Sequence, residues 1–201
     1  MSESIDKYTT NILTRRYSQF RDSCLLTNEM KKEYGLNIRG QNPPEDITEN
    51  MTKEIIRIHE GDTSCCWAKG VDKSGDLISD TFTEENPIEV KAFSSDGPSQ
   101  FGPDKNFGVL YFLDMRDWLN NHFVLWKVNL SNNSTEWKNV KVNRTETMEQ
   151  QCSQGRRPRI GWNSLYPQIQ NHCVKVYEGT FENIFIPPVP SDGSQSVEQL
   201  V

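Results

Sequence analysis

The chain has 201 residues, which is enough for one sizeable domain with its own hydrophobic core. Its net charge of −6 argues against a protein that coats nucleic acid without sequence preference, because such binding grows with the number of phosphates neutralised. The five cysteines, without any CxxC spacing, predict neither a disulfide framework nor a zinc site. No basic-then-apolar leader and no run long enough to span a membrane are present, so we expect a soluble, cytoplasmic protein.

Two amphipathic helices are predicted at the start of the chain. Over residues 5–30 apolar side chains recur every three or four positions, and the other face is charged. A Gly-, Asn- and Pro-rich stretch at residues 35–44 breaks this pattern. Asp46, with Glu49 three residues later, resembles a capping box, so we expect a second helix from there to about Gly61.

Beyond Cys65 the apolar pattern becomes that of strands, with short runs and a period of two. The predicted strands cover residues 76–82, 88–93, 109–115, 123–130 and 135–142. Helical spacing returns at residues 145–154 and 164–178. This order of elements predicts an α/β fold with a mixed central sheet flanked by helices.

Two charged residues stand on the predicted strand at residues 88–93. Because residues i and i+2 of a strand share a face, Glu89 and Lys91 point to one side and Val90 to the other. On a strand near the middle of a sheet, charges are costly to bury unless they are paired or bind a cation. The pair is therefore either an exposed ion pair or part of a functional site.

Asp76 favours a metal site. A hairpin between the two predicted strands could bring Asp76 close to Glu89, and two carboxylates with a backbone carbonyl, that of Val90, and waters would suit Mg²⁺. Lys91 could then orient the water that attacks a phosphodiester, while the cation neutralises charge on the phosphate oxygens. Asp72 and Asp80 stay open as alternatives to Asp76, and a tighter hairpin would use Asp80 instead.

The segments GDLI, residues 75–78, and IEVK, residues 88–91, together resemble the motif of the PD-(D/E)XK nuclease superfamily, an Asp opening one strand and Glu-x-Lys on the next. Gly75 stands where that superfamily often has proline, a position that shapes the turn and is not a ligand. Chain size and the initial helices are similar to those of small type II restriction endonucleases. The resemblance also implies a further acidic ligand from the preceding helix, for which Glu54 and Glu60 are candidates, although either is more simply helix surface.

Glu-x-Lys by itself is a weak signal, because it also occurs at residues 29–31 and 136–138. The first of these lies at the end of a polar helix and the second follows an Asn/Ser turn. We expect both to be surface, since only residues 89–91 combine apolar flanks with a suitable upstream Asp.

Two polar segments are candidates for contact with DNA. Residues 94–103 follow Lys91 directly and offer Ser94, Ser95 and Gln100 to phosphates or base edges, although an ordinary surface turn fits them as well. The second segment lies in a stretch, residues 138–175, with seven Lys or Arg against two Asp or Glu, a net of +5. Its candidates are Arg156, Arg157, Arg159, Trp162 and Asn163. Arginines pinned to acidic neighbours are the alternative.

These features predict a Mg²⁺-dependent type II restriction endonuclease acting on double-stranded DNA. The resemblance implies 5′-phosphate ends, a homodimer on a palindromic site, and a DNA methyltransferase that protects host DNA. We expect one nuclease domain at residues 1–186, with a helical part (1–62), a catalytic sheet (63–142) and a basic loop with a C-terminal helix (143–186), followed by a disordered Pro/Ser/Gly-rich tail at 187–201. A repair or Holliday-junction endonuclease of the same superfamily and a non-catalytic nucleic-acid-binding protein stay open as alternatives.

Overall fold

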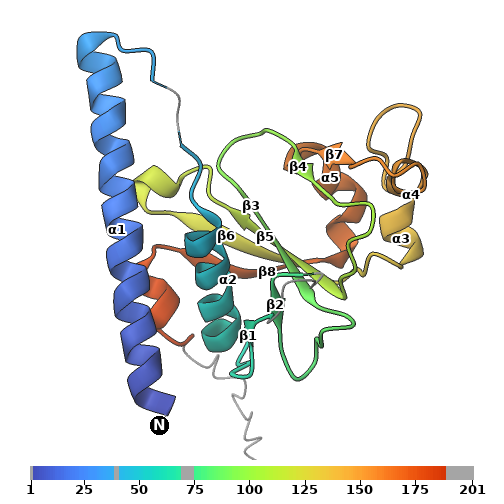
Figure 1. Ribbon diagram of the computed structural model, residues 1–201, viewed down its shortest axis with the longest axis horizontal. Coiled ribbons are helices and arrows are strands. Elements are labelled where there is room, and N and C mark those ends of the chain that lie inside the picture. The colour runs from blue at the N-terminus through green and yellow to red at the C-terminus, as the bar shows by residue number, and fades with distance from the viewer. Residues whose placement is uncertain (1, 39–40, 69–74, 189–201) are drawn as a thin grey trace, which may run out of the picture.

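A six-stranded mixed sheet crosses the middle of the computed structural model, which describes residues 2–38, 41–68 and 75–188, with side chains from residue 10 onward (Figure 1). The strand order is β1-β2-β3-β5-β6-β8. The β3–β5 pair is parallel, and the other pairs of this sheet are antiparallel. The strands are β1 (Cys66–Trp67), β2 (Leu77–Ile78), β3 (Ile88–Phe93), β5 (Val109–Asp114), β6 (Phe123–Val128) and β8 (Cys173–Gly179). The mixed α/β fold expected from the sequence is confirmed.

Helices α1 (Ser2–Tyr34) and α2 (Glu45–His59) cover one face of this sheet (Figure 1). The capping box expected at the start of α2 is wrong: Pro44 is the N-cap residue, without a side-chain cap hydrogen bond. Asp46 instead accepts a hydrogen bond from Arg16 Nε at 3.0 Å, which ties α2 to α1. Proline suits the start of a helix, because its φ is already close to the required value and an N–H at that place would have no acceptor within the helix.

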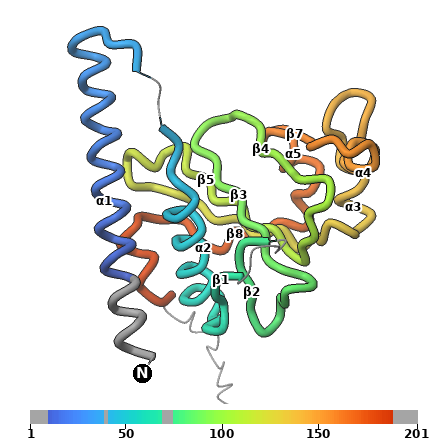
Figure 2. Tube along the Cα trace, in the orientation of Figure 1, coloured from blue at the N-terminus to red at the C-terminus, as the bar shows by residue number. Residues whose placement is uncertain are grey.

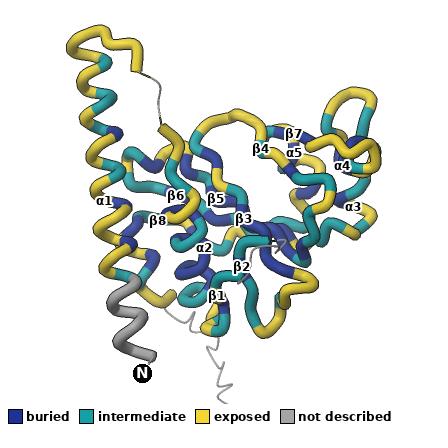
Figure 3. The backbone as a smooth tube through the Cα atoms, viewed as in Figure 1, coloured by how far each residue is buried: buried dark blue, intermediate teal, exposed yellow. Residues whose placement is uncertain are grey.

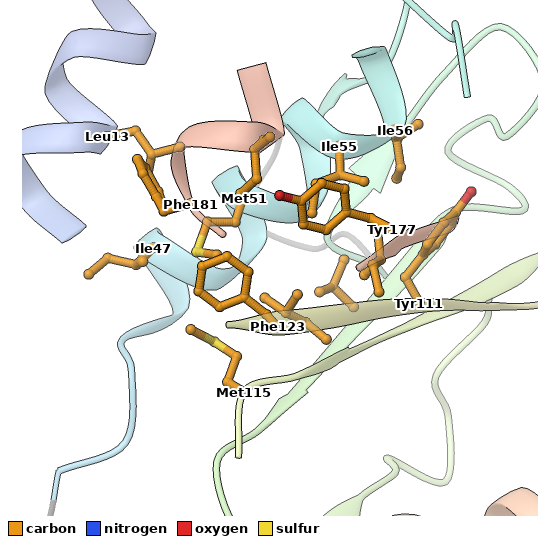
Figure 4. Packing of buried hydrophobic residues seen from close by; sticks show 14 of the residues in the cluster. Leu13, Ile47, Met51, Ile55, Ile56, Tyr111, Met115, Phe123, Tyr177 and Phe181 are labelled. Carbon is orange, nitrogen blue, oxygen red and sulfur yellow. The ribbon is translucent and has the colours of Figure 1, made fainter. Parts of the chain in front are cut away.

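The first hydrophobic cluster lies between these helices and the sheet (Figure 4). Ile47 and Met51 of α2 are fully buried, with Phe123 of β6 beneath them. Tyr17 of α1 stacks on Phe181 with ring centroids 4.3 Å apart, close to the short 3₁₀ helix η3 (Glu182–Phe185). Burial of each such side chain stabilises the fold by roughly 1.5–3 kcal/mol, so this cluster sets where α2 lies against β3.

The opposite face carries a second cluster, under α3 (Thr135–Lys138), α4 (Met148–Cys152) and α5 (Trp162–Ile169). Beside α5, β4 (Ser99–Gln100) and β7 (Arg159–Ile160) form a small antiparallel sheet (Figure 2). Burial is greatest along the middle strands (Figure 3), because one hydrophobic cluster packs on each face of the sheet.

Three sequence-based elements differ from the structure. Residues 135–142, expected as a strand, begin with α3, because Ser134 Oγ accepts a hydrogen bond from Trp137 N at 3.4 Å and caps a helical turn. The strand expected at residues 76–82 is only β2, since Ser79 N donates to Phe82 O at 2.7 Å and turns the chain. The helix expected at residues 164–178 ends with α5 and the 3₁₀ helix η2 (Gln170–His172).

The rest of that last segment is β8, which pairs with β6 and forms the far edge of the sheet. A further 3₁₀ helix, η1 (Trp118–Asn120), lies between β5 and β6. No helix in the described part of the chain has the length and apolar character needed to cross a membrane. Most of the predicted tail lies outside the described residues, which end at Pro188.

Candidate active site

Asp76 lies directly before β2, the strand that pairs with β3. Leu77 pairs with Ile88 in antiparallel register, and Asp76 comes directly before Leu77. The backbone N–H of Asp76 donates to Ile88 O at 2.9 Å, which holds the residue against β3. Asp80 follows the end of β2 and is exposed, and its backbone N–H donates to Ser64 Oγ at 2.9 Å. Asp76, and not Asp80, is therefore the aspartate whose backbone is bonded to β3.

The Asp76 carboxylate is held against the edge of β3, where Oδ2 accepts a hydrogen bond from Val90 N at 2.7 Å. In a strand the N–H and C=O of one residue face the same neighbouring strand. The Val90 carbonyl is therefore directed to the side on which Asp76 lies. Two of the three predicted metal-ligand groups, the Asp76 carboxylate and the Val90 carbonyl, share this edge of the sheet.

Gly75 is required by the backbone that precedes Asp76. Its φ is +101°, in a region that side chains with L configuration rarely adopt, and a Cβ there would lie 2.4 Å from Pro87 Cγ. Proline, with φ near −65°, cannot adopt this conformation. The departure from the superfamily motif at this position thus has a structural reason.

The Glu89 side chain is 2% exposed and has an ammonium group at each oxygen. Lys91 Nζ donates to Oε1, and Lys105 Nζ lies 3.5 Å from Oε2. Lys91 is on the same strand, as predicted, whereas Lys105 comes from the loop between β4 and β5. Nothing in the spacing of the sequence pointed to Lys105, because its approach depends on the path of that loop.

Burial and the neighbouring Glu89 charge raise the pKa of Asp76, although the Val90 N–H and the two lysines act in the opposite direction. Glu49, on α2, belongs to the same electrostatic environment. Burial first, then the charges of Asp76 and Glu45, raise the pKa of Glu49 to about 7. A set of carboxylates that resist ionisation together is the environment in which a cation binds favourably.

Glu49 was not among the candidates for a further acidic ligand, and the two that were have other partners. Glu54 is buried beside Lys53, with 3.1 Å between Nζ and Oε1. Glu60 accepts hydrogen bonds from the Tyr111 hydroxyl and from Lys127 Nζ. Asp72, also considered as an alternative to Asp76, lies outside the described residues.

The two candidate DNA-contacting segments lie side by side. The β4–β7 pairing puts Gln100 opposite Arg159, and both side chains are exposed. Asn163 donates to Asp96 Oδ1 at 3.0 Å, which joins the start of α5 to the loop that follows β3. These two segments, distant in sequence, thus form one surface at the end of β3.

The other candidate residues of these segments differ in whether their side chains are exposed or already bonded to other residues. Arg157 and Ser95 are exposed, and Ser94 Oγ donates to Asn42 Oδ1 at 2.7 Å. Arg156 forms an ion pair with Glu146, with 2.6 Å between Nη1 and Oε1, and its hydrogen bonds lower the pKa of Glu146 to about 2. For Arg156, the structure therefore agrees with the alternative expectation, in which an arginine of this loop pairs with an acidic neighbour.

Trp162 is covered by other aromatic rings. It is 7% exposed and packs on Phe112, with ring centroids 4.7 Å apart, and on Tyr166 at 5.2 Å. It therefore supports the surface from beneath and offers little area to DNA. The sequence signal, an aromatic residue beside arginines, does not distinguish a stacking residue from a core residue.

The site fits a hard divalent cation without a dedicated cage. Within the described residues no group of three or more His, Cys, Asp and Glu side chains is arranged to hold a metal ion. Mg²⁺ commonly keeps several waters and uses one or two protein carboxylates. Asp76, Glu89 and the Val90 carbonyl supply such a donor set.

The fold and this site define an α/β protein with two acidic residues and a lysine on or beside β3 of a mixed sheet. The sequence profile of the Bsp6I restriction endonuclease family matches residues 5–169, and the chain belongs to that family. A stretch of 75 residues is 39% identical to the type II restriction enzyme Bsp6I of Bacillus sp. (strain RFL6) and covers 36% of this chain and 41% of that enzyme. This match therefore spans less than half of that relative. No solved structure matches the chain.

Proposed function

We propose that this chain is a Mg²⁺-dependent type II restriction endonuclease of the PD-(D/E)XK superfamily, which hydrolyses double-stranded DNA at specific sites and leaves 5′-phosphate ends. The observation that carries the proposal is the hydrogen bond from Val90 N to Asp76 Oδ2, which holds the Asp76 carboxylate beside β3 next to Glu89, with Lys91 hydrogen-bonded to Glu89. Membership of the Bsp6I family supports it independently.

In this proposal Asp76, Glu89 and the Val90 carbonyl hold the Mg²⁺ ion. The bound ion would neutralise charge that develops on the phosphate oxygens. Lys91 is 22% exposed and lies on the face of β3 that carries Glu89, so its ammonium can orient an attacking water and stabilise the negative charge formed as that water loses a proton. Glu49 would stay close enough to add to the negative potential of the site.

The DNA interface in this proposal combines Ser94, Ser95 and Gln100 with Arg157, Arg159 and Asn163. Their segments are joined through the β4–β7 pair and Asp96, and they continue directly from β3. Arg156 would need to leave Glu146 to join them, and Trp162 would act by supporting α5. A homodimer on a palindromic site, and a DNA methyltransferase that protects the host DNA, complete the proposed function.

The test is cleavage of supercoiled plasmid and mixed genomic DNA with Mg²⁺, compared with EDTA, followed by sequencing of the fragment ends. We expect discrete fragments with one shared sequence at their ends, and none in EDTA. Glu89→Ala should abolish cutting. Glu29→Ala is the matched control, because it removes the same side chain from another Glu-x-Lys, exposed on α1, and should cut like the wild type.

Cutting that survives Glu89→Ala would contradict the site assignment. Cutting of branched DNA with little action on linear DNA would favour the repair or junction endonuclease. If diverse DNA is bound and left intact, the Glu89–Lys91 pair is structural and the protein is a binding module.

A further inference from the structure

Lys105 is a second cationic group at the active site, and the motif that identified Asp76, Glu89 and Lys91 does not include it. Its Nζ lies 3.5 Å from Glu89 Oε2, on the oxygen that Lys91 does not use. Its side chain is 39% exposed, whereas that of Lys91 is 22% exposed. Lys105 is therefore the ammonium group that reaches from the carboxylate toward solvent, where DNA would lie.

The loop that carries Lys105 is anchored at both ends. Phe101 and Phe107 are buried against Trp137, with ring centroids 5.1 and 5.5 Å from it. Phe101 N donates to Pro158 O at 3.0 Å, and Phe107 N donates to Asn132 Oδ1 at 3.1 Å. The base of the loop is thus fixed, while the long Lys105 side chain can change its rotamer.

The stem of Lys105 also passes closely over Gly102, where an added Cβ would lie 2.8 Å from Lys105 Cγ. The backbone N–H of Lys105 donates to Gly102 O at 3.3 Å and closes a turn. This close approach directs the side chain toward Glu89 rather than along the surface.

Lys91 and Lys105 bring two positive charges to the single negative charge of Glu89. A cation held by Glu89 and Asp76 would compete with both lysines for the Glu89 oxygens, and like charges so close repel each other. Lys91 is restricted by its place on β3, two residues from Glu89, so the loop lysine is the one that can leave. A lysine that leaves a carboxylate beside a bound nucleic acid finds its best new partner in a phosphate.

We propose that Lys105 binds a backbone phosphate of the DNA strand next to the bond to be cut, and that its ammonium moves from Glu89 to that phosphate when DNA binds. This inference rests on the proposed nuclease function. It assigns phosphate binding to Lys105 and leaves the positioning of the attacking water to Lys91.

The test compares Lys105→Ala and Lys105→Arg with Lys175→Ala. Lys175 is a suitable control because it is 48% exposed and pairs with a glutamate, Glu178, but lies on β8 at the far edge of the sheet. Binding to a labelled duplex of mixed sequence is measured in EDTA at several salt concentrations. Thermal melting of each variant is recorded alongside.

We expect Lys105→Ala to weaken binding on the order of tenfold, as for loss of a charged hydrogen bond. The slope of log K against log salt should fall by about 0.9, the value for one phosphate contact. Lys105→Arg should keep the wild-type slope, because arginine also binds phosphate. Lys175→Ala should match the wild type in both measurements.

An unchanged slope in Lys105→Ala, with or without a change in melting temperature, would overturn the proposal and leave Lys105 as a neutralising partner of Glu89. If Lys105→Ala does not fold, Lys105→Gln takes its place, with the same expected slope. Because binding in EDTA needs no cleavage, these outcomes are separate from those of the nuclease assay. Wild-type cutting with an unchanged Lys105→Ala slope would reject this inference alone.

Discussion

Asp76 and Val90 are joined by a hydrogen bond in which the Val90 N–H donates to Asp76 Oδ2 at 2.7 Å. The same carboxylate is therefore a structural group at the edge of β3 and a proposed metal ligand. Substitutions at Asp76 can separate these two roles.

Asp76→Asn keeps an oxygen that can accept from Val90 N, whereas Asp76→Ala removes it. We expect both variants to lose cleavage by about a hundredfold or more, since each removes a ligand charge worth several kcal/mol. Only Asp76→Ala should also lower the free energy of unfolding, by about 1 kcal/mol, the typical value of one hydrogen bond. Urea unfolding and plasmid cleavage measure the two effects, and equal stability of the two variants would speak against the structural role.

Gly75→Ala should destabilise the protein by about 1–3 kcal/mol, because it adds a strained backbone conformation and an overlap with Pro87. Gly61→Ala is the matched control: its φ is +73°, and an added Cβ has no atom within 4 Å. The control should therefore lose only the backbone contribution. The two free energies of unfolding, measured in urea, should differ, and Gly75→Ala should also cut more slowly because Asp76 follows it directly.

The raised pKa of Glu49 predicts that the free energy of unfolding depends on pH. Its pKa is raised to about 7 in the folded protein, so between about pH 4.5 and 7 the folded state holds a proton that the unfolded state has lost. Stability should therefore fall as pH rises through this window and level off above it. In EDTA the melting temperature of wild type should decrease from pH 5 to 8 more than that of Glu49→Gln. Parallel curves for the two proteins would contradict the raised pKa.

Arg116 is predicted to hold the loop after β3 in place. It donates to Asp114 Oδ2 at 2.6 Å and to Asp96 Oδ1 at 2.9 Å, and it lies over the Phe93 ring. Arg116→Ala should cost only about 1 kcal/mol of stability, because the residue is partly exposed. It should raise hydrogen exchange across residues 94–99 and weaken DNA binding.

Arg116→Lys tests whether charge or shape matters at this position. A lysine carries the charge but cannot bridge two carboxylates with a planar fork. We therefore expect Arg116→Lys to resemble Arg116→Ala in hydrogen exchange and to regain at most part of the stability. Full recovery by lysine would show that the loop needs only the positive charge.

The central strands could be predicted because their signal is local. Residues 109–114 are apolar on both faces over several positions, residues 88–93 alternate with Glu89 and Lys91 on one face, and the structure has β5 and β3 there. The helix expected over residues 164–178 is wrong from Cys173 onward: the apolar spacing there also fits a helix, but pairing with β6 makes these residues part of a strand. Residues 135–138 form a helix through the Ser134 cap, which overrides the alternating pattern.

By itself the sequence determined that Glu89 and Lys91 share a face of one strand, since a period of two is a property of the backbone. It also predicted Asp76 at the start of the neighbouring strand, and the structure has Asp76 directly before β2. The tertiary structure decided the rest of the surroundings: Glu49 instead of Glu54 or Glu60, Lys105 on Glu89, and Trp162 in the core. These contacts join residues far apart in the chain, and they depend on how α2, the β4–β5 loop and α5 pack against the sheet, which no local spacing encodes.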